Sequence, residues 1–329
     1  MIELFIKNSK GTFNITQLAE NITWSGDYQQ CARTLSVGLI SSYKDKNIPV
    51  IAFDLGNAIK LCDGKKVLFE GFIIERQKDT GSNIINITCY DRGFYLKRNQ
   101  TTMKFKNSTP EAITKRVCTD FDIPVGNVVP TGIKIKRNFI GVSLYQIIQT
   151  AYTLASQKNG KKYIIYFTGA ELNVIEKKVS KSTLLIESGK NLMSASMSES
   201  ISDMINQVAI YNENDKLIRT LKNSEQIKLY GVLQSYIKQS KGEDVTKDAK
   251  RLMSDNGVNQ RITVENLGNI SNITGGTVVV REPYTGVYGL FYIDSDAHTW
   301  QKGQYFNNLT LNFKNIMDEQ EAGSLPDNS

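Results

Sequence analysis

The chain has 329 residues, a length that suggests two or three domains, and its 40% hydrophobic content with 24 Gly and 6 Pro is typical of a folded chain. Its mean hydropathy is −0.31, and it contains no apolar run near the roughly 20 residues that a membrane helix needs. The net charge of +7 is uneven, because residues 101–182 hold 13 basic and 5 acidic residues while the rest is nearly neutral. We therefore expect no membrane segment and at least one separate basic unit.

The inventory of reactive residues excludes several classes of enzyme. His298 is the only histidine, so zinc sites built on two or three His are excluded and a Ser-His-Asp site would depend on this residue. No glycine-rich phosphate-binding motif occurs. Glu3 and Lys7 interrupt the N-terminal apolar run, which indicates no export signal. The four cysteines (Cys31, Cys62, Cys89 and Cys118) are far apart without C-x-x-C, so we expect reduced, partly buried thiols in a chain made in the bacterial cytoplasm.

The first hundred residues alternate between apolar and polar side chains, as half-buried strands do. Residues 31–39 show this period, and Asp63-Gly64 between 58–61 and 66–74 predicts a hairpin. Residues 2–7 and 83–91 supply further strands. We expect a closed or nearly closed antiparallel barrel over about 1–95.

Helical spacing first appears after residue 107. Ser108-Thr-Pro-Glu111 has capping-box spacing and predicts a helix that ends before Pro124. A second box-like start at Ser143 precedes an apolar stripe through Ala155, and residues 163–167 and 172–175 form a hairpin. This region is predicted to be a small α+β domain that carries the basic excess.

Strand patterns return from about residue 183. Strands are predicted at 192–198, 203–212, 216–221, 225–231, 261–266, 277–282, 288–293 and 309–313, with a helix around residues 245–253 that stops at Asn256-Gly257. The predicted fold class is mainly β with α+β insertions: two similar antiparallel β-barrel domains plus smaller α+β domains. The domains are expected at 1–99 (first barrel), 100–182 (basic α+β) and 183–314 (second barrel, with a helix-bearing insertion at about 235–285).

Three patterns are candidates for sites. On an extended strand, Asp294, Asp296 and His298 share one face and could hold a divalent ion, although no fourth ligand is suggested and the alternative is a strand that ends in a polar turn. Acidic pairs such as Glu70 with Glu75, or Glu199 with Asp203, arise by chance among 33 acids. We predict no catalytic, cofactor-binding or metal-binding residues.

The third candidate is the basic segment, as a nucleic-acid surface. Its cations could contact phosphates and its aromatics Phe139, Tyr145, Tyr152, Tyr163 and Tyr166 could stack on bases. The favoured alternative is a solvated basic face, or one that meets an acidic protein partner, so nucleic acid is not expected as a specific ligand. The cations are Lys134, Lys136, Arg137, Lys158, Lys161, Lys162, Lys177, Lys178 and Lys181.

Several dispersed segments together resemble a known family. They are 21–26 (NITWSG), 32–37 (ARTLSV), 61–64 (LCDG), 68–73 (LFEGFI), 90–91 with 95–99 (YD, YLKRN), 198–208 (SESISDMINQV), 230–234 (YGVLQ) and 285–293 (TGVYGLFYI) with 296–298 and 309–311. In this order they resemble the hub proteins of contractile phage tails and phage-tail-like particles, the XkdQ/YqbQ-like branch of the late control protein D-like hubs, over about residues 1–314.

The resemblance implies a non-enzymatic structural role. Hubs of this kind are homotrimeric rings in which each chain contributes two similar barrels, so that three chains present six units to the sixfold tail tube and threefold symmetry to the spike. The implied partners are the tube, the spike and other baseplate proteins of a virion, prophage or bacteriocin-like particle. The alternatives are a tail-associated cell-wall hydrolase and a nucleic-acid-binding module.

The last fifteen residues, 315–329, carry four acids and no base. Such a segment has too little apolar surface to offset the roughly 1–2 kcal/mol per residue that ordering costs, so we expect a flexible tail. Its charge predicts pairing with basic faces such as 134–137 or 158–162 on a neighbouring subunit or a partner, and a frayed terminus is the alternative.

Overall fold

The computed structural model describes residues 1–42, 45–79, 81–180 and 183–325. The chain divides into two compact units, one formed by Met1–Ala195 with Thr263–Ser329 and the other by Ser196–Ile262. The smaller unit begins and ends earlier in the chain than the predicted insertion at about 235–285. The predicted domain boundaries as a whole stay a prediction.

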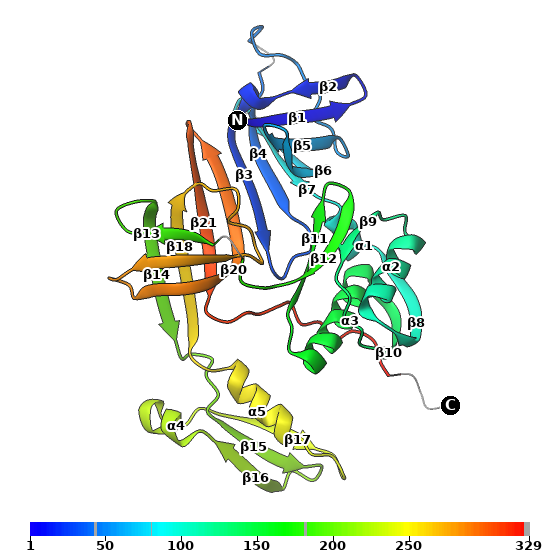
Figure 1. The fold of residues 1–329 in the computed structure, drawn as a ribbon, viewed down its shortest axis with the longest axis vertical. Coiled ribbons are helices and arrows are strands. Elements are labelled where there is room, and N and C mark those ends of the chain that lie inside the picture. Colours follow the sequence, from blue (N-terminus) through cyan, green and yellow to red (C-terminus); the bar gives the residue numbers. More distant parts are fainter. Residues whose placement is uncertain (43–44, 80, 181–182, 326–329) are drawn as a thin grey trace. The chain divides into compact units, whose positions relative to one another are not determined.

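Strands dominate the described part of the chain, and helices are few and short (Figure 1). The helices are η1 (Thr16–Leu18), α1 (Gly93–Arg98), α2 (Pro110–Asp120), α3 (Leu144–Asn159), α4 (Ser224–Tyr230) and α5 (Thr246–Asp255). The strands are β1 (Ile2–Asn8), β2 (Gly11–Asn14), β3 (Ala19–Asp27), β4 (Thr34–Ile40), β5 (Ala58–Asp63), β6 (Lys66–Lys78), β7 (Ile84–Tyr90), β8 (Gln100–Ser108), β9 (Val125–Val128), β10 (Ile135–Ser143), β11 (Tyr163–Thr168), β12 (Glu171–Glu176), β13 (Leu184–Glu187), β14 (Leu192–Ser200), β15 (Gln207–Asn212), β16 (Leu217–Lys222), β17 (Gln234–Gln239), β18 (Asn259–Leu267), β19 (Thr277–Glu282), β20 (Val287–Gln301) and β21 (Gln304–Asn312).

The first β region contains β1 to β7 in the order β3-β4-β7-β6-β5-β1-β2. The predicted hairpin is confirmed, because β5 and β6 join through Gly64, whose φ of 54° favours glycine. Inward side chains of these strands, among them Leu4, Leu35 and Ile73, form one buried core. The alternation seen in the sequence therefore marks the faces of real strands.

The two predicted β regions are joined into a single sheet of 13 strands. The second region contains β14, β18, β21, β20, β19 and β13, and its β20 pairs with β3 of the first region. Within the described residues the strands pair in one open order from β14 to β2. A closed first barrel would need β3 to pair with β2, but that edge of β3 pairs with β20. The mainly β fold is confirmed, but the strand pairs do not close two separate barrels.

Two long strands, β6 and β20, have the same internal organisation. In β6, residues 66–72 pair with β5 and residues 72–78 pair with β7. In β20, residues 287–292 pair with β19 and residues 292–301 pair with β21. Just beyond the change of partner each strand skips one residue, Ile74 in β6 and Asp294 in β20, as a β-bulge does. The meanders β5-β6-β7 and β19-β20-β21 are therefore two versions of one arrangement.

The middle region packs α1, α2 and α3 with the pair β8–β10 and the three-stranded sheet β11-β12-β9 around its own core. The capping box at Ser143 is confirmed, since Ser143 and Gln146 exchange backbone-to-side-chain bonds. The predicted box at Ser108 is wrong. Thr109 caps α2, and the Glu111 carboxylate accepts bonds from Thr131 instead of closing the box.

The smaller unit is a sheet of order β16-β15-β17 packed on α5. The predicted helix is confirmed as α5, and Ala249 lies fully buried against Val208 and Ile210. The strand predicted at 225–231 is wrong, because this segment forms α4, capped by the side chain of Asn223. β15 and β17 run parallel, as do β12 with β9 and β13 with β19, so the sheets are not purely antiparallel.

The C-terminal segment, residues 313–325, lies on the middle region (Figure 1). Met317 and Ala322 are buried in the core of that region, although we expected a tail outside the fold. The expectation failed because it counted only the apolar surface of the segment. Most of its attachment is made by hydrogen bonds to side chains of the middle region.

Candidate functional site

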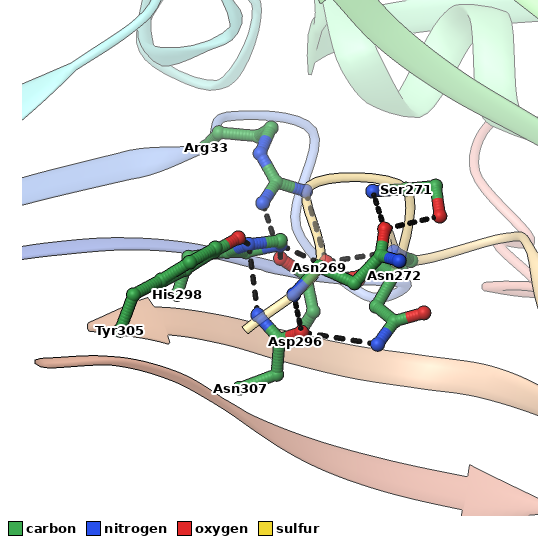
Figure 2. A network of polar contacts seen from close by, with 9 residues as sticks. Arg33, Asn269, Ser271, Asn272, Asp296, His298, Tyr305 and Asn307 are labelled. Atoms are coloured by element: carbon green, nitrogen blue, oxygen red, sulfur yellow. Dashed lines mark hydrogen bonds and ion pairs between the residues drawn. The ribbon is translucent and has the colours of Figure 1, made fainter. Parts of the chain in front are cut away.

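A buried polar network lies at the seam where β3 pairs with β20 (Figure 2). Residues 295–301 of β20 run antiparallel to residues 21–27 of β3, and Asp296 stands opposite Gly26. A Cβ at Gly26 would lie 2.3 Å from Nη1 of Arg33. Glycine at this position therefore leaves room for the arginine that reaches Asp296.

Asp296 is fully surrounded by donors. Nη1 of Arg33 donates to Oδ1 at 3.0 Å, and Nη2 makes a second, shorter contact with Oδ2. The backbone N–H and the hydroxyl of Thr274 also donate to Oδ1, at 2.7 and 2.6 Å. Burial alone would raise the pKa of Asp296, but Arg33 and His298 hold it well below its usual range. The carboxylate thus stays ionised and connects β20 to the loop that carries Thr274 and to the segment between β3 and β4.

His298 has partners at both ring nitrogens. Nδ1 accepts from Nδ2 of Asn307 at 2.9 Å and lies 2.8 Å from the Tyr305 hydroxyl. Nε2 lies 3.1 Å from the carbonyl oxygen of Asn272 and 3.2 Å from Oδ2 of Asp296. Because both groups near Nε2 are acceptors, the proton of the neutral ring belongs on Nε2. The imidazole is fully buried and serves as a connector within the seam.

The trio weighed as a metal site does not assemble. Asp294 is the bulged residue of β20, and it accepts from Asn312 at 2.9 Å and faces Lys177 at 3.9 Å, whereas Asp296 faces Arg33. The alternative of a polar turn is also wrong, since β20 continues to Gln301. Across the described ranges no three His, Cys, Asp or Glu side chains are grouped to hold a metal. The bulge separates residues that strand periodicity placed on one face.

The acidic pairs lack an enclosed setting. Glu70 forms an ion pair with Lys60 at 3.2 Å in which both side chains are over 40% exposed, and Glu75 is exposed. Glu199 accepts from Gln260 and is exposed, as is Asp203. A general acid needs a raised pKa in a protected site, so neither pair has the surroundings of a glycosidase pair.

The basic segment is only partly a solvated face. Lys134, Lys136, Lys158, Lys161 and Lys178 are exposed, and Lys181 lies outside the described residues. Of the interleaved aromatics, Phe139, Tyr145, Tyr152 and Tyr163 are all less than 5% exposed, so they belong to the core and cannot stack on bases, whereas Tyr166 is half-buried. The burial of these rings removes the main support for nucleic-acid binding.

Lys177 is a cation of the basic segment whose burial the sequence does not indicate. Its side chain is fully buried, donates to the carbonyl oxygen of Ile316 at 2.7 Å and lies 3.9 Å from the Asp294 carboxylate. Burial lowers the pKa of Lys177, and Asp294 opposes this shift. In the sequence it is one lysine among nine cations, and only contacts with residues more than 100 positions away distinguish it.

A cleft of about 610 Å³ opens beside the seam. It is lined mainly by apolar side chains, among them Val67, Ile164, Tyr166 and Ile273. Its charged side chains are mostly committed elsewhere: Arg33 binds Asp296, and Glu176 binds Lys161 and Lys178. Among the described residues of this lining we find no acid and base placed together for catalysis.

The chain is similar to proteins of phage tails and phage-like elements. The chain is 25% identical over 97% of its length to the phage-like element PBSX protein XkdQ of Bacillus subtilis, and the match covers 99% of that protein. Its fold is similar to the 43 kDa tail protein of prophage MuSo2 from Shewanella oneidensis, with a TM-score of 0.71, 14% identity and coverage of 94% of this chain and 98% of that one.

A second similar structure is the E. coli c3393 protein, described as a component of the type VI secretion system similar to phage T4 tail proteins gp27 and gp5. The TM-score is 0.54 at 10% identity, and the match covers 94% of this chain and 77% of that one. No helix within the described ranges is long and apolar enough to cross a bilayer. The model of the YQBQ-like family matches residues 22–312. The resemblance seen in the sequence is confirmed, and the chain belongs to the YQBQ-like family.

Proposed function

We propose that the chain is the structural hub of a phage-type tail baseplate, a trimeric ring adaptor that joins the sixfold tail tube to the threefold spike. The similarity to a phage-like-element protein along nearly the whole chain supports a role in a tail. The observation that carries the symmetry argument is the repeated meander, β5-β6-β7 and β19-β20-β21. Three chains with two such units each present six similar elements on one side of a ring.

The seam supports a load-transmitting role rather than catalysis. The buried Arg33–Asp296 ion pair at the seam is satisfied within the chain, and it links the two β regions of the single sheet. A rigid connection of this kind keeps the two repeated units at a constant spacing, which a symmetry adaptor requires. We infer that the protein is not an enzyme and that its partners are the tube, the spike and neighbouring baseplate proteins. It would be made in the bacterial cytoplasm and then assembled into the particle.

The test is a cryo-electron microscopy reconstruction of particles from cells that carry this chain and its neighbouring tail genes. We expect three copies between tube and spike, with the two meanders of each copy facing successive tube subunits. Six copies per particle, or a location away from the tube–spike junction, would contradict the proposal. The isolated protein need not be trimeric, because ring contacts can require a tube or spike to form.

A peptidoglycan digestion assay separates the hub from the cell-wall hydrolase. The purified chain is expected to leave peptidoglycan intact at several pH values. Digestion that survives repurification and is lost in a variant with Glu70→Gln or Glu199→Gln would favour the enzyme.

A further inference from the structure

The C-terminal segment packs on α3, where its hydrogen bonds go to residues between positions 145 and 153. Tyr145 donates to Asp318 at 2.7 Å, the backbone N–H of Gln320 donates to Thr153 at 3.1 Å, and that of Ala322 donates to Thr150 at 3.0 Å. Gln149 also donates to the carbonyl oxygen of Asp318. Because positions 145, 149, 150 and 153 share one face of a helix, they form a row of polar groups along α3.

This row has the character of a receptor for a peptide. Gln149, Thr150 and Thr153 are at most 2% exposed, and buried polar groups need partners. The segment supplies them through backbone N–H and C=O groups as well as through one carboxylate. Recognition through backbone groups requires an extended chain, and the buried carboxylate requires an aspartate at one position.

The two acids at the centre of the segment differ in their surroundings. Asp318 is 8% exposed and receives the Tyr145 hydroxyl, and burial together with Asp318 raises the pKa of Tyr145 far above its usual value. Glu319 is 47% exposed and pairs with Lys162 at 2.7 Å. Asp318 is therefore recognised by buried groups of the site, whereas Glu319 forms a solvent-exposed ion pair at its edge.

The end of the segment pairs with β10 through an isolated antiparallel β-bridge. Asn138 and Ser324 exchange both backbone hydrogen bonds, at 2.8 and 2.9 Å, and Nε of Arg137 donates to the carbonyl oxygen of Ala322 at 3.0 Å. Gly323 has a φ of 75°, and a Cβ there would lie 2.2 Å from the carbonyl oxygen of Asn138. The site thus requires glycine immediately before the strand pair.

We propose that α3 and β10 form a docking site for an extended acidic peptide, and that residues 315–325 are the peptide it holds in the free chain. The bonds described above all go to the middle region, so the site does not depend on a covalent link between the peptide and β21. Arg137 and Lys162 belong to the two basic faces, 134–137 and 158–162, that the sequence analysis named as possible partners of the acidic segment. Both residues bind the segment of their own chain.

The experiment separates the peptide from its site. A protease recognition sequence is inserted between Lys314 and Asn315 of the full chain, the folded protein is cleaved, and a fluorescein-labelled synthetic peptide of residues 315–325 is added. Fluorescence anisotropy is expected to show saturable binding to cleaved protein from which the resident peptide has been washed, and none to the uncleaved chain. The same peptide is tested on a chain that ends at Lys314, with circular dichroism as the check of folding.

Peptides with single substitutions test which side chains of the segment contribute to binding. Asp318→Asn is expected to weaken binding by more than ~10-fold because it removes a buried charged acceptor, whereas Glu319→Gln changes it by less than ~3-fold. Gly323→Ala is expected to abolish strand addition and weaken binding by at least ~10-fold. Failure of the peptide to bind folded, cleaved protein would overturn the proposal. Equal effects of Asp318→Asn and Glu319→Gln would do so as well, because they would indicate non-specific charge attraction.

Discussion

Arg33 and Asp296, which are 263 residues apart in the chain, form a bidentate ion pair that connects β20 to the segment between β3 and β4. The Asp296 side chain is fully buried and that of Arg33 is 13% exposed, and the guanidinium also lies 4.1 Å from the centre of the Trp24 ring. The pair therefore helps to hold the two β regions in one sheet.

Breaking this pair is expected to cost far more than breaking a surface pair. Arg33→Met or Asp296→Asn should each lower the free energy of unfolding by about 3–5 kcal/mol, since each leaves a buried charge without its partner. The double variant should lose less than the sum of the two, which urea unfolding measures. Lys60→Met at the exposed Lys60–Glu70 pair is the control and should cost less than about 1 kcal/mol. Equal losses at both pairs would contradict a structural role for the seam.

Asp91 is expected to make stability depend on pH. Burial raises its pKa to about 7, although the backbone N–H groups of Arg33 and Gly93 donate to it and oppose the shift. An unfolded aspartate has a pKa of about 3.9, so between pH 4 and 7 the folded chain keeps a proton that the unfolded chain has lost. The free energy of unfolding should therefore fall as the pH rises through this range.

Asp91→Asn should remove that part of the dependence. Urea unfolding of the variant and the parent at pH 4.5 to 8 gives the difference in slope, and Asp54→Asn, at a carboxylate that is 64% exposed, is the control. Parallel profiles for Asp91→Asn and the parent would show that Asp91 is ionised throughout.

Gly93 is expected to tolerate no side chain. A Cβ there would lie 2.3 Å from the carbonyl oxygen of Cys31 and 2.8 Å from Cα of Ala32, both backbone atoms that cannot turn aside. Gly93→Ala should destabilise the chain by about 1–3 kcal/mol and move the melting temperature down by several degrees. The control is Gly257→Ala, whose Cβ would make only an ordinary contact at 3.9 Å. A Gly93→Ala variant as stable as the control would refute the close approach of these segments.

The four thiols are expected to be unreactive in the folded chain. All four cysteines are free and buried, and burial raises the pKa of Cys118 to about 12 and those of Cys31, Cys62 and Cys89 above their usual range. Because the thiolate is the reactive species, Ellman's reagent at pH 8 should titrate almost none before unfolding and four in guanidinium. Prompt titration of a thiol in the native state would indicate that its surroundings open.

The sequence alone determined the properties that depend on near neighbours. The period of two along residues 31–39, the Asp63-Gly64 turn and the capping box at Ser143 each predicted the observed element, because strands, turns and caps are governed by groups a few residues apart. The ordered set of dispersed segments also identified the family. The opposite charges predicted that the C-terminal segment pairs with the basic faces, but on a neighbouring subunit or a partner instead of within the same chain.

The tertiary structure alone decided which distant groups meet. The pairing of β3 with β20, the burial of Lys177 between Asp294 and Ile316, and the docking of residues 315–325 on their own chain all join groups more than 100 residues apart. The β-bulge at Asp294 similarly changes which side chains of β20 share a face, and the sequence of that strand does not predict the bulge. Such contacts depend on how whole strands are arranged, and many arrangements satisfy the same local pattern, so only the folded chain distinguishes them.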